Sequence, residues 1–176
     1  MARKSRGDTS YGGTYHVTFE VNRQAMELRD PNTKALCIQI IAEAHQKYAF
    51  KLWNFCIMDN HIHFLITPEK NVSLSLIMKW IKMVFAIRWN TLHGVKGRLW
   101  GDRFHARVIE NREDFLRVFQ YINQNPVKAG LVSQAKEWVF GGLYHYLHTI
   151  VHIVPTFPDL LVKVFTADFS VKGTVL

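Results

Sequence analysis

The strongest constraint on the fold is a pair of strand-like segments joined by a two-residue turn. Residues 50–58 and 61–67 are rich in β-branched and aromatic residues, and Asp59 and Asn60 between them favour a tight turn. Strands separated by so short a connection pair with each other in antiparallel fashion. The chain therefore contains a β-hairpin, and its other segments have to pack around it.

The segments on either side of the hairpin alternate between strand and helix patterns. Strand patterns occupy residues 15–21 and 104–110, and apolar residues recur at helical spacing over residues 33–48 and 73–92. The resulting order, β-α-β-β-α-β, is typical of the split βαβ arrangement, in which two helices cover one face of an antiparallel sheet. We therefore predict an α+β fold of ferredoxin-like architecture.

A third helix follows the last strand of this pattern. Asn111 is a favoured N-cap residue, and Glu113 and Asp114 stand in the first turn, where the helix dipole favours acidic side chains. Pro126 is expected to end or kink this helix. The helix is the obvious cover for the open face of the sheet, and residues 131–176 are expected to form an irregular tail.

The composition indicates one folded domain with a basic surface. The chain has 176 residues, 48% of them hydrophobic, and a formal net charge of +8, which suggests an anionic partner. No apolar run is long enough to cross a bilayer, and the basic start leads into no apolar segment, so we expect neither a membrane span nor a signal peptide. Cys37 and Cys56 are interpreted as buried free thiols, consistent with a cytoplasmic protein.

Two histidines stand one residue apart on the second strand of the hairpin. Because side chains alternate between the faces of a strand, His61 and His63 point the same way, and Ile62 and Phe64 point to the other face. Two imidazoles placed in this way can converge on one cation. The alternative is a pair of packed or solvent-facing histidines, and the pair by itself leaves both interpretations open.

The third helix carries a polar stripe that includes a tyrosine. Tyr121 is the one aromatic residue on this stripe, and Asn125 follows it by four residues on the same face. A tyrosine hydroxyl among polar groups and cations can be deprotonated for nucleophilic attack. The alternative is an interfacial tyrosine whose ring is packed and whose hydroxyl faces water.

A basic segment, residues 96–107, precedes and includes the last strand. Arg98, Arg103 and Arg107 are interpreted as phosphate contacts, and Trp100 as a platform on which a DNA base stacks. Lys128, at the end of the third helix, is a further candidate DNA contact. The alternative for this segment is a solvated loop with its tryptophan in the core.

Two longer motifs resemble those of a known protein family. Residues 58–66 (MDNHIHFLI) are similar to the His-hydrophobic-His motif of the one-tyrosine (HUH) transposases, and residues 121–132 (YINQNPVKAGLV) resemble their tyrosine helix. With the segments 15–18 and 99–104, the similarity is greatest to the REP-associated tyrosine transposases. It extends from about Tyr15 to Tyr146 in the expected order.

The resemblance implies a mechanism. His61 and His63 would bind Mg²⁺ or Mn²⁺, with Asn125 completing the metal shell. Tyr121 would attack single-stranded or hairpin DNA, which gives a 5′-phosphotyrosine intermediate, a free 3′-hydroxyl and later strand transfer. The family includes dimers and monomers, so a monomer and a homodimer both remain open.

The resemblance also divides the chain and leaves other functions to weigh. Residues 1–13 would form a basic arm, residues 14–146 the transposase domain and residues 147–176 an extension of unknown role. The main alternative is a catalytically silent regulator that binds DNA hairpins, although binding alone requires neither the histidine pair nor the tyrosine. A nucleotide hydrolase of the H-x-H-x-H kind is excluded, since Leu65 stands in place of its third histidine.

Three residues depart from the family pattern. Asp59 stands where the family commonly has a proline, so the turn before the histidine pair is looser or gains a carboxylate. Gly141 and Gly142 stand where serines are usual in the family's Trp-x-x-Ser-Ser-Tyr ending.

Overall fold

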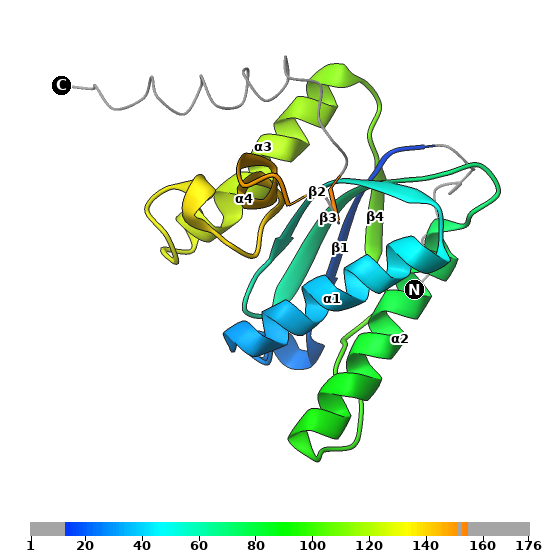
Figure 1. The fold of residues 1–176 in the computed structure, drawn as a ribbon, viewed down its shortest axis with the longest axis vertical. Helices are drawn as coiled ribbons and strands as arrows, with labels where there is room; N and C mark the ends of the chain where they lie inside the picture. The colour runs from blue at the N-terminus through cyan, green and yellow to red at the C-terminus, as the bar shows by residue number, and fades with distance from the viewer. Residues whose placement is uncertain (1–12, 151–152, 155–176) are drawn as a thin grey trace, which may run out of the picture.

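The secondary structure follows the predicted order. The computed structural model describes residues 13–150 and 153–154. Its strands are β1 (Tyr15–Glu20), β2 (Phe50–Ile57), β3 (His61–Pro68) and β4 (His105–Val108). Its helices are α1 (Pro31–Lys47), α2 (Leu74–His93), α3 (Arg112–Lys128) and α4 (Gly142–Leu147), with short 3₁₀ turns η1 (Asn22–Gln24) and η2 (Ala135–Glu137). The order β1-α1-β2-β3-α2-β4 confirms the predicted ferredoxin-like α+β fold (Figure 1).

The four strands form one antiparallel sheet in the order β2-β3-β1-β4. The first strand lies inside the sheet, between β3 and β4, and the register places its residues directly opposite those of both neighbours. Thr18 lies opposite His63 on β3 and opposite His105 on β4, and Glu20 lies opposite His61. The histidine pair is therefore on an inner strand, where its position is fixed from both sides.

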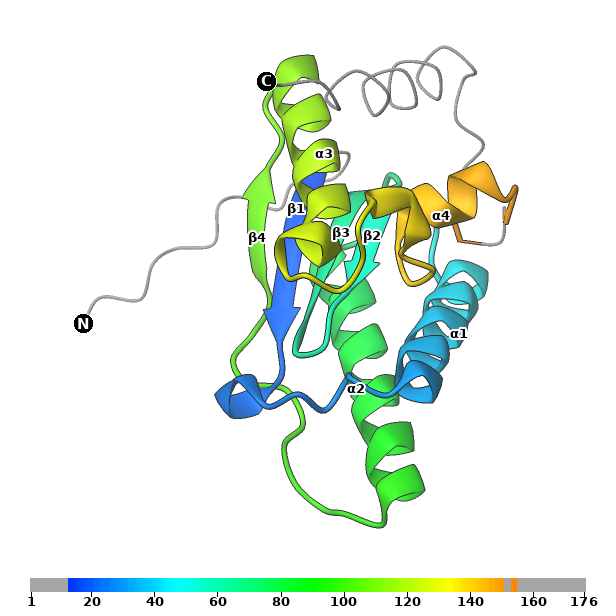
Figure 2. The same cartoon turned by 90° about the vertical axis from the view of Figure 1, so that its left-hand side faces the viewer.

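The two faces of the sheet have separate hydrophobic clusters. α1 and α2 cover one face, and the side chains beneath them, such as Val17, Phe19 and Phe64, are at most 2% exposed. α3 covers the other face, where Leu65 packs with Phe119 and neighbouring α3 residues in a smaller cluster. Figure 2 shows α3 running along the strands, and Figure 1 shows α1 and α2 on the opposite side of the sheet. The predicted cover is confirmed.

α3 is attached to the sheet edge at its first turn. The Asn111 side chain accepts a hydrogen bond from the Asp114 N–H (2.9 Å), which confirms the predicted cap. The buried Asp114 carboxylate accepts two hydrogen bonds from Arg107 of β4, at 2.8 and 3.0 Å, and one from Arg117. These bonds hold the pKa of Asp114 far below its usual range. The start of the tyrosine-bearing helix is thereby connected to strand β4.

α3 does not end at Pro126, and this corrects one of the two outcomes expected from the sequence. The helix continues to Lys128, and Pro126 is buried within it. A proline removes one backbone hydrogen bond from a helix. Burial of the apolar face of α3, where Val118, Phe119 and Ile122 are at most 4% exposed, offsets that loss.

The predicted irregular tail is wrong for residues 131–150. η2 and α4 form there, and Gly141 pairs with Cys56 of β2 in an isolated bridge. Gly142 explains one departure from the family pattern, because an added Cβ would overlap the side chain of Asn54. Ile153 and Val154 are buried in the main core. Residues 1–12 of the proposed arm and residues 151–152 and 155–176 of the extension lie outside the described residues.

Two further expectations concern the class of protein. Cys37 and Cys56 are buried free thiols, as predicted. Within residues 13–150 and 153–154, no helix has the length and apolar character needed to span a membrane.

Candidate active site

Strands β1 and β3 place three histidines on the face covered by α3. His61 and His63 lie on this face, as predicted, with ring centroids 4.9 Å apart and ring planes perpendicular. The ring of His16, from β1, stacks on that of His63 with centroids 5.3 Å apart. The cluster therefore consists of three imidazoles from two neighbouring strands.

His63 is buried, and one of its nitrogens has no partner. Its Nδ1 lies 3.1 Å from His16 Nε2 and 3.3 Å from Thr18 Oγ1. Its Nε2 is buried without a hydrogen-bond partner among the described residues. Since buried polar atoms are almost always paired, an unpaired ring nitrogen indicates a position that receives a further group.

His61 is oriented by the residue before it. The Asn60 Oδ1 lies 2.7 Å from His61 Nδ1, and an amide oxygen can only accept, so Nδ1 carries the hydrogen. The lone pair is then on Nε2, the form in which an imidazole binds a cation. The Asn60 amide in turn donates to the Gln24 backbone oxygen (3.3 Å), which holds Asn60 in place.

The surroundings keep these imidazoles neutral. Burial is the main reason that the pKa of His63 falls to about 3, and the nearby His61 and His16 lower it further. Burial and then the charge of Arg107 lower the pKa of His16 to about 4, and burial lowers the pKa of His61. Neutral imidazole is the form that can bind a metal ion, so protonation of these rings does not prevent cation binding at neutral pH.

α3 brings the predicted tyrosine to the histidines. The ring of Tyr121 lies 5.6 Å from that of His63 and 5.8 Å from that of His16, in edge contacts with both. Tyr121 remains 42% exposed, so its side chain is accessible from solvent. The Lys128 ammonium lies 5.3 Å from the centre of its ring. A nucleophile candidate, a cation and neutral imidazoles thus share one surface.

Asn125 also belongs to this group, although its amide is partly occupied. Its Nδ2 donates to the Tyr121 backbone oxygen (2.8 Å), one helical turn earlier. The Asn125 side chain is close enough to His63 to oppose the lowering of the pKa of that histidine. The Asn125 side chain therefore lies on the histidine side of α3.

The donor set fits a hard divalent ion that keeps several other ligands. Within the described part of the chain, no three His, Cys, Asp or Glu side chains converge on one point that could hold a metal. Two imidazoles and one amide oxygen would leave the remaining positions of an octahedral ion to water and phosphate oxygens, as Mg²⁺ sites commonly do. The unpaired buried Nε2 of His63 is the observation that supports the fit.

The predicted DNA-contact residues separate into two groups. Trp100 is 7% exposed, and its ring packs against Phe19 and Phe85. The alternative of a core tryptophan is therefore correct, and the prediction that a DNA base stacks on Trp100 is wrong. Its buried indole N–H donates to the Lys82 backbone oxygen. Arg107 is engaged by the Asp114 carboxylate. Arg98, Arg103, Arg107 and Lys128 are all exposed, and of these four only Arg107 makes an ion pair with another described residue.

Sequence reasoning gave no role to several residues of this site. His16 and Thr18 alternate on β1, which places them on one face, but only the pairing of β1 with β3 brings them against His63. Asn60 precedes the histidine pair directly, and its bond to His61 depends on the turn geometry. Alternation within β1 was the available signal for the first two.

The chain and its fold are similar to those of known transposases. The sequence model of the family described as "Transposase IS200 like" matches residues 9–125. The REP-associated tyrosine transposase of Escherichia coli is 28% identical over 130 residues, which are 73% of this chain and 75% of that protein. A Haemophilus influenzae protein assigned to the same group is 26% identical over 156 residues. The solved structure of a REP-associated tyrosine transposase bound to a REP hairpin has a TM-score of 0.71 at 23% identity, covering 88% of this chain and 90% of that one.

Proposed function

The chain belongs to the IS200-like transposase family, and we propose that it cleaves and rejoins single-stranded or hairpin DNA through a covalent tyrosine–DNA intermediate. The observation that carries this proposal is the meeting of Tyr121 with the neutral imidazoles of His16 and His63. A hairpin-binding protein that does no chemistry would not need an accessible tyrosine beside a buried, unpaired imidazole nitrogen.

In the proposed reaction Tyr121 is the nucleophile. Its phenolic oxygen forms a bond to the scissile phosphorus, and the bond between that phosphorus and the 3′ oxygen breaks. The phenol loses its proton, and the 3′ oxygen takes up a proton and becomes a free hydroxyl. The phosphotyrosine bond keeps the energy of the phosphodiester, so a 3′-hydroxyl can reverse the step and join strands without ATP.

The other residues of the site orient and attract the substrate. His61, His63 and Asn125 would hold Mg²⁺ or Mn²⁺, which would polarise the scissile phosphate when bound. Asn60 keeps His61 in the tautomer that presents Nε2. Lys128 adds positive charge beside the nucleophile, where the DNA phosphate has to approach.

The proposed substrate is DNA in single-stranded or hairpin form. One solved structure with this fold is a transposase bound to a REP hairpin, and the net charge of +8 suits a polyanionic partner. Arg98 and Arg103 are exposed and available for phosphate contacts. The proposal places the reaction in the cytoplasm, with the protein acting as a monomer or a homodimer.

Covalent capture tests the nucleophile. The protein is incubated with labelled single-stranded hairpins in Mg²⁺ or Mn²⁺ and denatured in detergent, and DNA that stays attached is measured. Tyr121→Phe should abolish the adduct and leave hairpin affinity within about twofold, since one hydroxyl is removed and the ring stays. Tyr144→Phe is the matched control, because Tyr144, in α4, stacks on His148 rather than on the histidine cluster. Adducts that persist in Tyr121→Phe would refute the assignment.

Metal binding is measured separately from cleavage. Wild-type protein should bind Mn²⁺ in titration calorimetry, and His61→Ala with His63→Ala should not. Equal Mn²⁺ binding by both proteins would show that the ion is held elsewhere. Salt-sensitive hairpin binding with no adduct under any ion would identify a DNA-binding regulator instead.

A further inference from the structure

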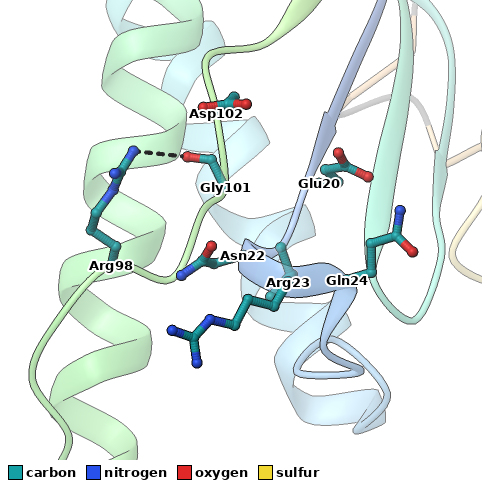
Figure 3. A pocket seen from close by; sticks show the side chains of 8 residues that line it. Glu20, Asn22, Arg23, Gln24, Arg98, Gly101 and Asp102 are labelled. Carbon is teal, nitrogen blue, oxygen red and sulfur yellow. Dashed lines mark hydrogen bonds between the residues drawn. The ribbon is translucent and has the colours of Figure 1, made fainter.

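The candidate metal ligands are held by neighbouring residues that act on the ligand side chains rather than on the metal. For His61 this neighbour is Asn60, whose amide donates to the Gln24 backbone oxygen (3.3 Å) in η1. Figure 3 shows that end of β1, where Glu20 and Gln24 line a polar pocket. Neighbours of this kind fix the direction of a metal-binding imidazole and the position of its hydrogen. His63 requires an equivalent partner.

Strand β1 supplies possible partners for His63 on the face covered by α3. Thr18 lies directly opposite His63 in the pairing of β1 with β3, and His16 stands two residues earlier on the same face. His16 Nε2 is 3.1 Å from His63 Nδ1, and Thr18 Oγ1 is 3.3 Å from the same nitrogen. Because β1 is an inner strand with a paired neighbour on each side, these partners have fixed positions.

The two ring nitrogens of His63 have different surroundings. Nδ1 faces β1, whereas Nε2 is buried and has no hydrogen-bond partner among the described residues. The nitrogen that is open to a cation is therefore Nε2. A neutral imidazole carries one hydrogen, and the nitrogen that binds a cation must offer a lone pair. Cation binding at Nε2 thus requires the hydrogen of His63 to be on Nδ1.

A hydrogen on the Nδ1 atom of His63 requires an acceptor. His16 Nε2 is such an acceptor when the hydrogen of His16 is on its own Nδ1. In the opposite arrangement His16 donates, the hydrogen of His63 is on Nε2, and that nitrogen has no lone pair for a cation. The direction of this one hydrogen bond therefore decides whether His63 can act as a ligand.

The contacts favour His16 over Thr18 as the residue that controls His63. A threonine hydroxyl rotates freely between donating and accepting, and Thr18 Oγ1 is the more distant of the two atoms. The ring of His16 stacks on that of His63 with centroids 5.3 Å apart, and Tyr121 makes an edge contact with it at 5.8 Å. His16 is therefore held between the candidate ligand and the candidate nucleophile.

We propose that His16 is a positioning residue, whose Nε2 accepts the Nδ1 hydrogen of His63 and so presents His63 Nε2 to the divalent ion. This inference rests on the proposed function for the metal site, and it adds a residue that acts through His63 rather than on the metal. Removal of such a partner commonly weakens metal binding by about 10–100-fold.

Calorimetric titration with Mn²⁺ tests the acceptor. His16→Phe keeps a flat ring beside His63 but has no acceptor, so Mn²⁺ binding should weaken by about 10–100-fold. His16→Gln brings an amide oxygen near the position of Nε2 and should recover most of this loss. His105→Phe is the matched control, because His105 is an exposed histidine of β4 that lies opposite Thr18. It should leave Mn²⁺ affinity within about twofold of wild type.

A spectroscopic measurement separates the hydrogen bond from general packing. Two-bond ¹H–¹⁵N spectra of the histidine rings report which nitrogen carries the hydrogen, and Mg²⁺ is the diamagnetic probe. In saturating Mg²⁺, wild-type His63 should carry its hydrogen on Nδ1, and at the same Mg²⁺ concentration His16→Phe should show a mixture of the two tautomers. This measurement on wild type needs no variant, so it tests the proposal even if His16→Phe fails to fold.

Three results would overturn the role of His16. They are equal Mn²⁺ affinity in wild type and His16→Phe, no recovery in a folded His16→Gln protein, and a wild-type His63 that carries its hydrogen on Nε2 in saturating Mg²⁺. Adducts at Tyr121 together with unchanged Mn²⁺ affinity in His16→Phe would leave the proposed function standing and remove only this role. The expected differences in Mn²⁺ affinity without any adduct would support the role of His16 and remove the proposed cleavage.

Discussion

The attachment of α3 to the sheet depends on a buried amide, which makes Asn54→Ala the most informative stability test. Asn54 is fully buried on β2, beside the irregularity in its pairing with β3. Its Nδ2 donates to the Phe119 oxygen (3.1 Å) and to Asn123 Oδ1 (2.8 Å), both on α3. Its Oδ1 accepts from the Phe55 N–H (2.9 Å). One side chain thereby joins the sheet to the helix that carries Tyr121.

The expected loss follows from these three bonds. Each contributes about 1 kcal/mol net, and leaving a buried acceptor such as Asn123 Oδ1 without its donor costs roughly 1–3 kcal/mol more. Asn54→Ala should therefore lower the free energy of unfolding by about 4–6 kcal/mol, a third or more of the total stability of many domains. Asn90→Ala is the control, since its Nδ2 bond to the Gly97 oxygen is at the surface; it should cost about 0.5 kcal/mol.

Urea denaturation at 25 °C, followed by circular dichroism at 222 nm, measures the loss. A double-mutant cycle with Asn123→Ala tests the reason for it, because two side chains in contact should show a coupling energy of about 1–2 kcal/mol. The reasoning would be refuted by a loss below about 1 kcal/mol for Asn54→Ala, or by single effects that add without coupling. The amount of covalent DNA adduct should also fall in Asn54→Ala, because a loosely attached α3 would misplace Tyr121.

Three further predictions concern other contacts. Gly142→Ala should destabilise by about 1–3 kcal/mol in urea, because its Cβ would overlap Asn54; unchanged stability would contradict the close approach. Arginine neighbours lower the pKa of Asp114, so its carboxylate stabilises the fold above the unfolded-state pKa of about 4, and this contribution is lost as pH falls toward the lowered folded-state value. The stability difference between wild type and Asp114→Asn should thus shrink from pH 6 to pH 2, and a constant difference would refute the ion-pair account. Lys34 is 2% exposed and pairs with Asp59 at 2.7 Å. Lys34→Met should cost about 1–3 kcal/mol in urea, and adding Asp59→Asn should recover part of it, whereas no recovery would show that the orphaned charge was not the cause.

The pair of Lys34 and Asp59 also accounts for a departure from the family pattern. Asp59 takes the place of a proline in the turn before the histidine pair, and the structure ties that turn to α1 through its carboxylate. Its backbone oxygen accepts from the Leu28 N–H (3.0 Å). An ion pair and a backbone bond thus fix the turn, and neither could be read from the sequence, because Lys34 is 25 residues away from Asp59.

Local periodicity accounts for the elements that the sequence predicts correctly. Two local patterns predicted these elements: alternation over β1 and β3, and helical spacing over α1, α2 and α3. Both patterns involve residues close together in the sequence, so they can be recognised without knowing the fold. α4 escaped prediction because it has only six residues, no side-chain cap and a glycine at its start. The helix is instead stabilised by packing against β2, where Gly142 closely approaches Asn54.

The sequence by itself determined the order of strands and helices from β1 to α3, the common face of His61 and His63, and the stripe that joins Tyr121 to Asn125. Only the tertiary structure decided that His16 lies against His63, that Tyr121 meets both rings, and that Trp100 is buried. The physical reason is the distance along the sequence over which each feature is determined. Side-chain direction within a strand or helix repeats every two or 3.6 residues, whereas contacts between elements depend on which distant segments pair and on the burial that holds them together.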